Sequence, residues 1–452
     1  MHHADPADPA ARVYTQQTLD HFNAADNRTW SQRYFVNDTF YSATEHTAVF
    51  LQLGGEGGIG SDYVEAFQYV EYARQHDALI VALEHRFYGA SLPLPDLSTD
   101  NLAYLSSMQA LEDAVQFTNW LKTTYPGLTE DTPVFVFGCS YSGALVSWAR
   151  QKYPFVFQGA VAGSAPVLAT LDFYAYLETV EVSLSTLVGE RCVEQVQNAT
   201  DQIQTLLQSG EGQAKVQSMF KTCTAPNNTL DTATLMQNLM GNWMGVVQYN
   251  NERAGAPSVS SLCATMNNYT DPLEAYVAIS DDFLKGEGAA CMDISYAIQV
   301  QMLKNVSAPP SGVGARAWTY QTCTAFGYFQ TTDAPSGTQP FGDLVPLSYS
   351  LQLCEDVFGL GIDVGAAINA TNARYGGHSP DTTRVVYIDG TIDPWRPLTV
   401  LAAPNEDSPV ISIVGTAHCA TSFPVSPIDP PGVAPAFKQV SMLLGDWINN
   451  PE

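Results

Sequence analysis

Hydrophobic positions in the first third of the chain form two alternating kinds of segment. Short, continuous apolar runs are typical of buried strands, and they span residues 47–53, 78–85, 133–137 and 159–166. Between them, apolar residues recur at helical spacing over residues 64–76, 108–126 and 143–154. Strands that alternate with helices in this way predict a parallel sheet covered by helices on both faces.

The pattern changes between residues 171 and 311. This stretch has helical spacing, clearest over 177–196 and 232–249, and it holds four cysteines and no strand–helix alternation. Strand patterns return at 384–390 and 409–415, and a helix at 437–448 closes the chain. We therefore predict an α/β sheet domain interrupted by a helical insertion, with the boundaries 1–12 (flexible N-terminus), 13–170 and 312–452 (sheet domain), and 171–311 (insertion).

The charge balance excludes some partners. The 452 residues include 19 Lys and Arg against 46 Asp and Glu, a net charge of −27. Such a chain is not expected to bind nucleic acid or an anionic membrane. The balance fits a protein that works in acid, where protonated carboxyls no longer repel one another, but a general solubility feature explains it equally well. No apolar stretch reaches the length of about 18 residues that a membrane span needs.

Cysteines and glycosylation sequons indicate a compartment outside the cytosol. An even count of eight cysteines and seven Asn-x-Ser/Thr sequons predict a secreted or lysosomal/vacuolar glycoprotein. The opening MHHADPADPA has no apolar signal core, so we expect any signal peptide to have been removed. The candidate glycosylation sites are Asn27, Asn37, Asn198, Asn227, Asn268, Asn305 and Asn369.

Six of the cysteines can staple the helical region. Sequence alone does not fix their connectivity. Our hypothesis pairs Cys192 with Cys263, Cys223 with Cys291, and Cys323 with Cys354. Cys139 and Cys419 are left over.

The segment VFVFGCSYSGALVSWA (134–149) carries the strongest chemical signal. An apolar strand runs into Gly138, and a helical stretch follows Ser140. A strand, a sharp turn with serine in Gly-x-Ser-x-Gly, and a helix form the nucleophile elbow of α/β-hydrolases. Here Ser142 holds the last position of the motif, and glycine follows one residue later. The alternative is a simple turn serine, which is how we interpret Gly-x-Ser at residues 89–91.

Chain order restricts the partners of such a nucleophile. In α/β-hydrolases the acid follows the serine and the histidine follows the acid. The late strand at 384–390 leads into two candidate acids, Asp389 and Asp393, and His418 is the one histidine beyond them. We prefer Asp393, because a loop side chain can reach across to the histidine. His418 would be the general base, and the aspartate would orient it.

The oxyanion of such a site needs two backbone donors. The N–H of Tyr141, which follows the nucleophile, is one expected donor. The second should come from the loop after an early strand, and GGEGG at 54–58 offers Gly55 or Glu56.

With these residues in place, the chain resembles the prolyl carboxypeptidase / dipeptidyl peptidase II family of serine peptidases. The resemblance is closest to its thymus-specific serine protease branch and to fungal and protist relatives. It runs nearly end to end through LDHFN (19–23), SQRYF (31–35), GGEG (54–57), EHRFYGAS (84–91), GCSYSGALVSWARQKYP (138–154), GSAPV (163–167), WTYQTCTAFGYF (318–329), LCEDVFG (353–359), YGG (375–377), DGTIDPW (389–395) and GTAHCA (415–420).

The resemblance implies an α/β-hydrolase domain with a helical cap inserted after the nucleophile, and catalysis by Ser140, Asp393 and His418. This chain departs from the family pattern at two positions. Cys139 replaces a frequent glycine, and Asp389 replaces the usual asparagine. Neither change removes a catalytic group.

The resemblance also implies a peptide substrate, cleavage after proline in several modes, and acid pH. Tyr141, Phe326 and Trp395 are candidates for an apolar wall. Glu56 and Glu84 can bind a free amine and Arg86 a carboxylate, although structural ion pairs explain all three equally well. We expect no cofactor and no metal ion. Family members often dimerise, so a homodimer is one expectation, without an interface signature in this sequence.

Two other classes of function stay open at this stage. A secreted esterase or lipase uses the same fold and triad, and a non-catalytic binding protein can be built on a hydrolase fold. The triad also predicts that Cys139 and Cys419 lie near each other. A disulfide between them and two buried thiols are equally compatible with the sequence.

Overall fold

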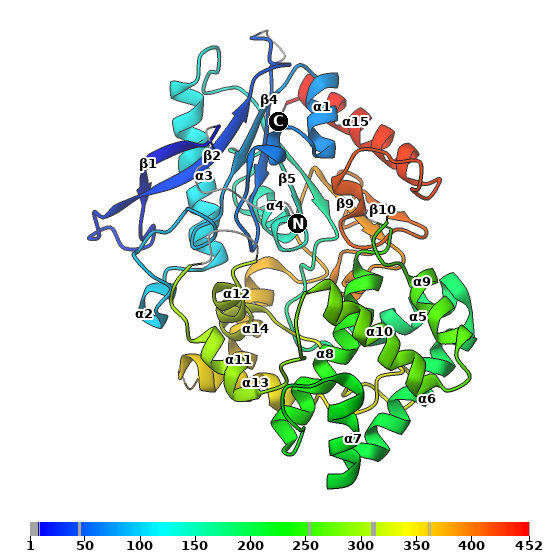
Figure 1. Cartoon of the computed structure of the whole chain (residues 1–452). Coiled ribbons are helices and arrows are strands. Elements are labelled where there is room, and N and C mark those ends of the chain that lie inside the picture. The colour runs from blue at the N-terminus through cyan, green and yellow to red at the C-terminus, as the bar shows by residue number, and fades with distance from the viewer. Residues whose placement is uncertain are drawn as a thin grey trace.

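A computed structural model gives the fold for residues 8, 10–43, 47–251, 255–308, 313–359, 361 and 363–451. Most of the N-terminal segment expected to be flexible (1–12) lies outside these residues. The centre of the fold is an eight-stranded sheet (Figure 1). In spatial order the strands are β1 (Arg12–Thr18), β2 (Thr29–Asn37), β4 (Leu79–Leu83), β3 (Val49–Leu53), β5 (Val134–Cys139), β6 (Gly159–Gly163), β9 (Val385–Gly390) and β10 (Val410–Ile413).

The six strands from β4 to β10 pair in parallel, as the strand–helix alternation predicts. The hairpin β1–β2 pairs antiparallel with itself and with β4, and the hydrophobic pattern does not reveal it. Its inward positions include Gln17 and Gln32, which are buried and hydrogen-bond each other at 2.6 Å. Polar residues that have hydrogen-bond partners can occupy the inward positions of a strand, and the sequence then lacks the alternation of apolar and polar residues that predicts a strand.

Helices cover both faces of the sheet and enclose one hydrophobic core on each face. Strand β5 contributes side chains to both cores. Val134 and Val136 point into one hydrophobic cluster, while Phe135 and Phe137 point into the other. This alternation is the period of two that a strand imposes on its side chains. On the first face lie α3 (Ser107–Thr124) and α4 (Tyr141–Lys152), and on the second lie α1 (Gln68–Gln75) and α15 (Val433–Asn449).

The cap begins after β6 and consists of helices. Figure 1 shows α5–α10 grouped to one side below the sheet. The helices of residues 173–311 are α5 (Ala175–Val188), α6 (Glu190–Leu207), α7 (Gly210–Phe220), α8 (Thr229–Gln248), α9 (Val259–Asn268), α10 (Pro272–Gly286) and α11 (Tyr296–Leu303). The single helix predicted over 177–196 is divided at Gly189, whose φ of 92° ends α5 and begins α6.

Further helices precede the return to the main sheet. They are α12 (Ala315–Gln321), α13 (Leu347–Phe358) and α14 (Val364–Tyr375), and the sheet resumes with β9 at Val385. A two-stranded parallel sheet, β7 (Thr170–Asp172) with β8 (Gly327–Phe329), joins the start of the insertion to this later segment. The resumption of the hydrolase domain at residue 312 remains a prediction.

Three disulfides stabilise the helical region. Cys192–Cys263 joins α6 to α9, Cys223–Cys291 joins the segment after α7 to the segment after α10, and Cys323–Cys354 joins the turn after α12 to α13. The hypothesised pairing of these six cysteines is confirmed.

Candidate active site

Ser140 lies at a sharp turn between β5 and α4. Its backbone angles, φ 60° and ψ −132°, are outside the regions that residues with a side chain normally occupy. The turn is fixed on both sides, because the Ser140 N–H donates to Gly163 O (3.0 Å) and Ala144 N–H donates to Ser140 O (3.0 Å). A serine held in such a conformation is the elbow geometry that the sequence predicts.

The neighbouring glycines explain how the turn fits although Ser142 ends the motif. A Cβ at Gly138 would lie 2.3 Å from Ser142 O, and a Cβ at Gly143 would lie 2.5 Å from Gly163 O. Glycine is therefore required where α4 approaches β6, one residue after its usual place. Ser142 uses its hydroxyl locally, since it accepts from Cys139 N–H and donates to Cys139 O, both at 3.0 Å.

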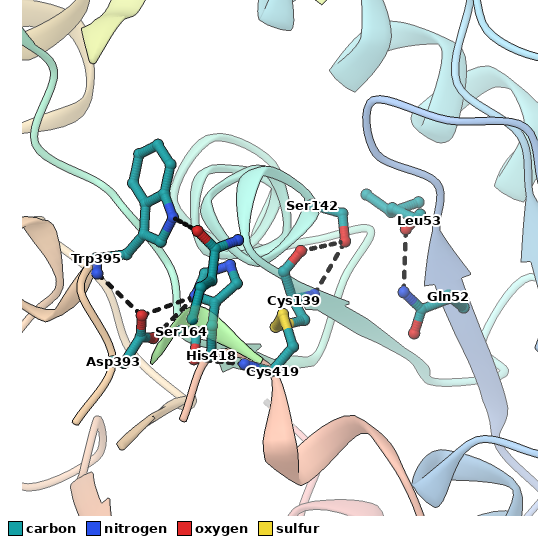
Figure 2. The surroundings of a disulfide bond; sticks show 10 residues. Gln52, Leu53, Cys139, Ser142, Ser164, Asp393, Trp395, His418 and Cys419 are labelled. Atoms are coloured by element: carbon teal, nitrogen blue, oxygen red, sulfur yellow. Dashed lines mark hydrogen bonds and ion pairs between the residues drawn. A yellow bond between two sulfur atoms is a disulfide. The ribbon is translucent and has the colours of Figure 1, made fainter. Parts of the chain in front are cut away.

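His418 and Asp393 form a buried pair. The His418 Nδ1 lies 3.0 and 2.9 Å from the two carboxylate oxygens of Asp393, and both side chains are almost fully buried (Figure 2). The backbone N–H of Trp395 also donates to Asp393 Oδ1 at 2.9 Å. With Nδ1 committed to the carboxylate, the other ring nitrogen is left for proton exchange.

The competing acid, Asp389, has other partners. Its Oδ1 accepts from Arg396 Nε at 2.8 Å, and its Oδ2 accepts from the Ser412 hydroxyl at 2.6 Å. Asp389 ends β9, whereas Asp393 lies in the following loop. The geometry therefore pairs the histidine with the acid that the sequence analysis preferred.

Ser140 and His418 line one cavity of about 460 Å³. Glu56 lines it too, and burial raises the pKa of this carboxyl while the neighbouring His418 opposes the shift. One wall is aromatic: Tyr63 stacks on Phe67 with 4.6 Å between ring centroids, and Phe67 lies 5.3 Å from Phe423. The sequence analysis did not find this wall, because its members come from two loops far apart in the chain.

The residues expected to supply the oxyanion donors lie close to Ser140: Tyr141 follows it in the chain, and Gly55 and Glu56 line the same cavity. Tyr141 is the first residue of α4, so its N–H has no acceptor within the helix. A Cβ on Gly55 would lie 3.6 Å from Ser142 Cβ and 3.7 Å from Ser142 N, which brings the loop after β3 against the start of α4. The Tyr141 ring is turned away and anchored, since its hydroxyl contacts His85 Nε2 (3.1 Å) and accepts from Gln321 Nε2 (2.9 Å).

A disulfide joins Cys139 to Cys419, so the first of the two alternatives holds (Figure 2). It ties the residue before the nucleophile to the residue after the histidine, and both cysteines line the cavity. The same loop is held by a hydrogen bond from Cys419 N–H to Ser164 Oγ at 3.1 Å.

Two of the candidate substrate-binding residues, Glu84 and Arg86, form structural ion pairs, which is the alternative that the sequence left open. Glu84 is fully buried and forms an ion pair with Arg33, with further hydrogen bonds from Ser91 Oγ and two backbone N–H groups. Arg86 is fully buried and makes two 2.6 Å bonds to Asp113. Neither can meet a peptide terminus, because its charge is already neutralised inside the domain.

The aromatic candidates are placed differently. Phe326 is fully buried behind the Tyr141 ring, at 5.3 Å between centroids, and does not line the cavity. Its expected contact with substrate is therefore wrong. Trp395 lies closer to the chemistry, since its ring is 6.0 Å from the His418 ring. Its Nε1–H donates to Gln248 Oε1 at 3.0 Å, a cap residue that carries no motif and was missed.

The sequons lie largely at the surface. Six of the seven asparagines are exposed. Asn37 is the exception: it is partly buried, and its side-chain amide donates to Val64 O at 2.8 Å. Within the part of the chain that the structure describes, no helix is long and apolar enough to span a bilayer.

Comparison with known proteins gives this geometry a family. A model described as serine carboxypeptidase S28 matches residues 17–440. The thymus-specific serine protease of Mus musculus is 36% identical over 97% of this chain and 87% of its own length. The lysosomal Pro-X carboxypeptidase of Homo sapiens is 27% identical over 97% of this chain and 88% of its own length.

A third relative, a putative serine protease of Caenorhabditis elegans, is 33% identical over 96% of this chain and 87% of its own length. The matches extend over sheet domain and cap together. The chain belongs to the serine carboxypeptidase S28 family and is a serine-type peptidase.

Proposed function

We propose that this peptidase cleaves peptide bonds after proline or another small residue, at acid pH, with Ser140 as nucleophile, His418 as general base and Asp393 as the orienting acid. The observation that carries the proposal is that Ser140 and His418 line one cavity, while Asp393 is hydrogen-bonded to Nδ1 of the His418 imidazole.

The reaction would proceed in two steps. His418 takes the proton of the Ser140 hydroxyl while the Ser140 oxygen attacks the carbonyl carbon of the peptide bond. His418 then gives that proton to the leaving amine. Water, activated by the same imidazole, hydrolyses the acyl-enzyme. The N–H groups of Tyr141 and of Gly55 or Glu56 would stabilise the oxyanion, since such donors act where negative charge develops.

Support for the substrate class comes from the cavity and from the relatives. Proline on the acyl side needs an apolar surface without donors, and Tyr63, Phe67 and Phe423 supply an aromatic one. A relative is named a Pro-X carboxypeptidase. Glu56 is the remaining candidate for a free substrate amine, and Trp395 for the wall near the histidine.

The proposed place of action is a secreted or lysosomal/vacuolar compartment. The four disulfides, the exposed sequons and the net charge of −27 support it. A lysosomal relative agrees with it. A homodimer remains a prediction from the resemblance.

One experiment tests the function and its details together. Proline-containing peptides, with free or acetylated N-termini, are incubated over a pH series with the wild type, Ser140→Ala and Glu56→Gln, and the products are identified by mass spectrometry. We expect cleavage after proline with an acid optimum, and none with Ser140→Ala. If Glu56 binds the amine, acetylation and Glu56→Gln each slow cleavage, and their effects do not add.

Two results would overturn the proposal. Rapid turnover of a short acyl ester with no peptide hydrolysis would make the protein an esterase. Fluorophosphonate labelling that is unchanged in Ser140→Ala would remove Ser140 from the nucleophile role and favour a binding protein.

A further inference from the structure

Gln248 is the last residue of cap helix α8, and it contacts both the backbone of His418 and the indole of Trp395. The backbone oxygen of Gln248 accepts a hydrogen bond from the backbone N–H of His418 at 2.9 Å. Its side-chain oxygen accepts from Trp395 Nε1 at 3.0 Å and from the Tyr176 hydroxyl at 2.6 Å. Both of these donors are buried, Tyr176 almost completely. A residue of the cap thus meets the catalytic loops of the sheet domain.

These contacts close a ring of hydrogen bonds. From Gln248 the ring runs to the His418 backbone, through the imidazole to Asp393, from Asp393 to the Trp395 N–H, and from the Trp395 indole back to Gln248. Figure 2 shows the Asp393 carboxylate between the His418 ring and the Trp395 backbone N–H. Within this ring, Gln248 is the sole member from the cap.

We propose that Gln248 is a positioning residue, through which the cap holds His418 and Asp393 in the geometry that catalysis needs. This rests on the proposed roles of His418 and Asp393. The cap is then part of the catalytic framework as well as a cover over the cavity. Tyr249, the next residue, lines that cavity with its ring 6.3 Å from the His418 ring, so the same helix end faces the substrate.

The side chain of Gln248 fixes where its backbone oxygen lies. One amide oxygen serves two buried donors. A side chain without an acceptor would leave the Trp395 indole N–H unpaired and the Tyr176 hydroxyl with a long 3.5 Å contact to Met244 O, which is costly in a buried site. Tyr176 and Trp395 would shift to find other partners, and the end of α8 would shift with them. Small displacements of a catalytic base lower the rate strongly, because proton transfer depends on a short, aligned contact.

The test uses Gln248→Met, which keeps the length of the side chain and removes the acceptor. We expect kcat to fall about 10- to 100-fold while KM changes by less than about twofold. Gln248→Glu keeps an acceptor oxygen and should recover most of kcat. Gln237→Met is the matched control, because Gln237 lies on the same helix, is partly buried, and is not in the ring. Active sites are counted by fluorophosphonate titration, so that rates refer to folded enzyme.

A second readout does not need turnover. The proton shared by His418 and Asp393 gives a low-field resonance in the proton NMR spectrum, and Gln248→Met should broaden or shift it while Gln237→Met should not. An unchanged resonance together with unchanged kcat overturns this inference. So does a rise in KM alone, since that would place Gln248 in substrate binding. A wild type without peptidase activity would overturn the proposed function, and the NMR comparison would still decide the role of Gln248.

Discussion

Two buried polar clusters lie at the carboxyl ends of parallel strands of the same sheet, and they differ in how their charges are used. Beyond β4, Glu84 and Arg86 are enclosed by Arg33 and Asp113. Beyond β5 and β9, Ser140, His418 and Asp393 adjoin a cavity, and Ser140 has a strained backbone. Residue type alone does not separate a structural cluster from a catalytic one. The first has a partner for every charge, and the second leaves reactive atoms facing open space.

The largest effect expected from the comparison is the loss of the nucleophile. Ser140→Ala should lower kcat roughly 10⁴- to 10⁶-fold, because triad members act as a unit. The melting temperature should stay within a few degrees, since the Ser140 hydroxyl makes no hydrogen bond to any other residue that the structure describes. Turnover and calorimetry measure both. A variant that keeps a tenth of the activity would remove Ser140 from the mechanism.

The structural cluster should respond in the opposite way. Arg86→Met leaves Asp113 buried without its two guanidinium bonds, and removing one partner of a buried pair costs about 3–5 kcal/mol. We expect the free energy of unfolding to fall by that amount while kcat per active site is preserved. Denaturant titration and active-site counting separate the two. A large loss of kcat in the folded variant would mean that the clusters are coupled.

His85 lies between the two clusters and gives a pH test. Burial lowers its pKa from 6.5 to about 4, and its ring contacts Arg86 O and the Tyr141 hydroxyl. As pH falls from 6.5 to about 4, the unfolded chain takes up a proton that the folded chain does not. Stability contributed by neutral His85 is therefore lost over this window, up to about 3 kcal/mol.

The measurement compares wild type with His85→Gln. Both will lose stability in acid as carboxyls titrate, so the difference between their unfolding free energies isolates the histidine. That difference should change progressively between pH 6.5 and 4 and level off below it. A constant difference across the window would show that His85 takes up its proton at the same pH in the folded and unfolded chains, and would contradict a lowered pKa.

Breaking the link at the active site should cost less than losing the nucleophile. Cys139→Ser with Cys419→Ser frees the histidine loop from the elbow, and we expect kcat to fall about 10- to 100-fold before any unfolding. The matched control is Cys323→Ser with Cys354→Ser, which opens a disulfide whose cysteines do not line this cavity and should affect stability more than kcat. Mild reduction of the wild type should reproduce the first result, because Cys139 and Cys419 line the cavity.

The smallest expected effect concerns the second aspartate. Asp389→Asn keeps oxygen and nitrogen near Arg396 and Ser412, so most activity should remain. Kinetics of this variant beside Asp393→Asn measures the contrast. Near-complete inactivation by Asp389→Asn alone would reverse the assignment of the acid.

Much of this molecule could be read from its sequence. Apolar runs predicted the parallel strands because those strands are buried on both faces, and chain order predicted the histidine because just one lies late enough. The hairpin β1–β2 was not predicted because two of its inward positions are glutamines, Gln17 and Gln32, which hydrogen-bond to each other inside the fold. Gln248 escaped for a different reason. Its role depends on where a helix ends in space, and no local pattern records that.

The disulfide beside the nucleophile also has a consequence in time. It joins residues 280 apart, and the other three disulfides all lie within the segment it encloses. A ribosome adding about 5–20 residues per second makes Ser140 tens of seconds before His418. The nascent chain therefore carries its proposed nucleophile without its proposed base, and the link can close only after the whole cap has been made. A peptidase built this way becomes competent last, when its own synthesis is nearly finished.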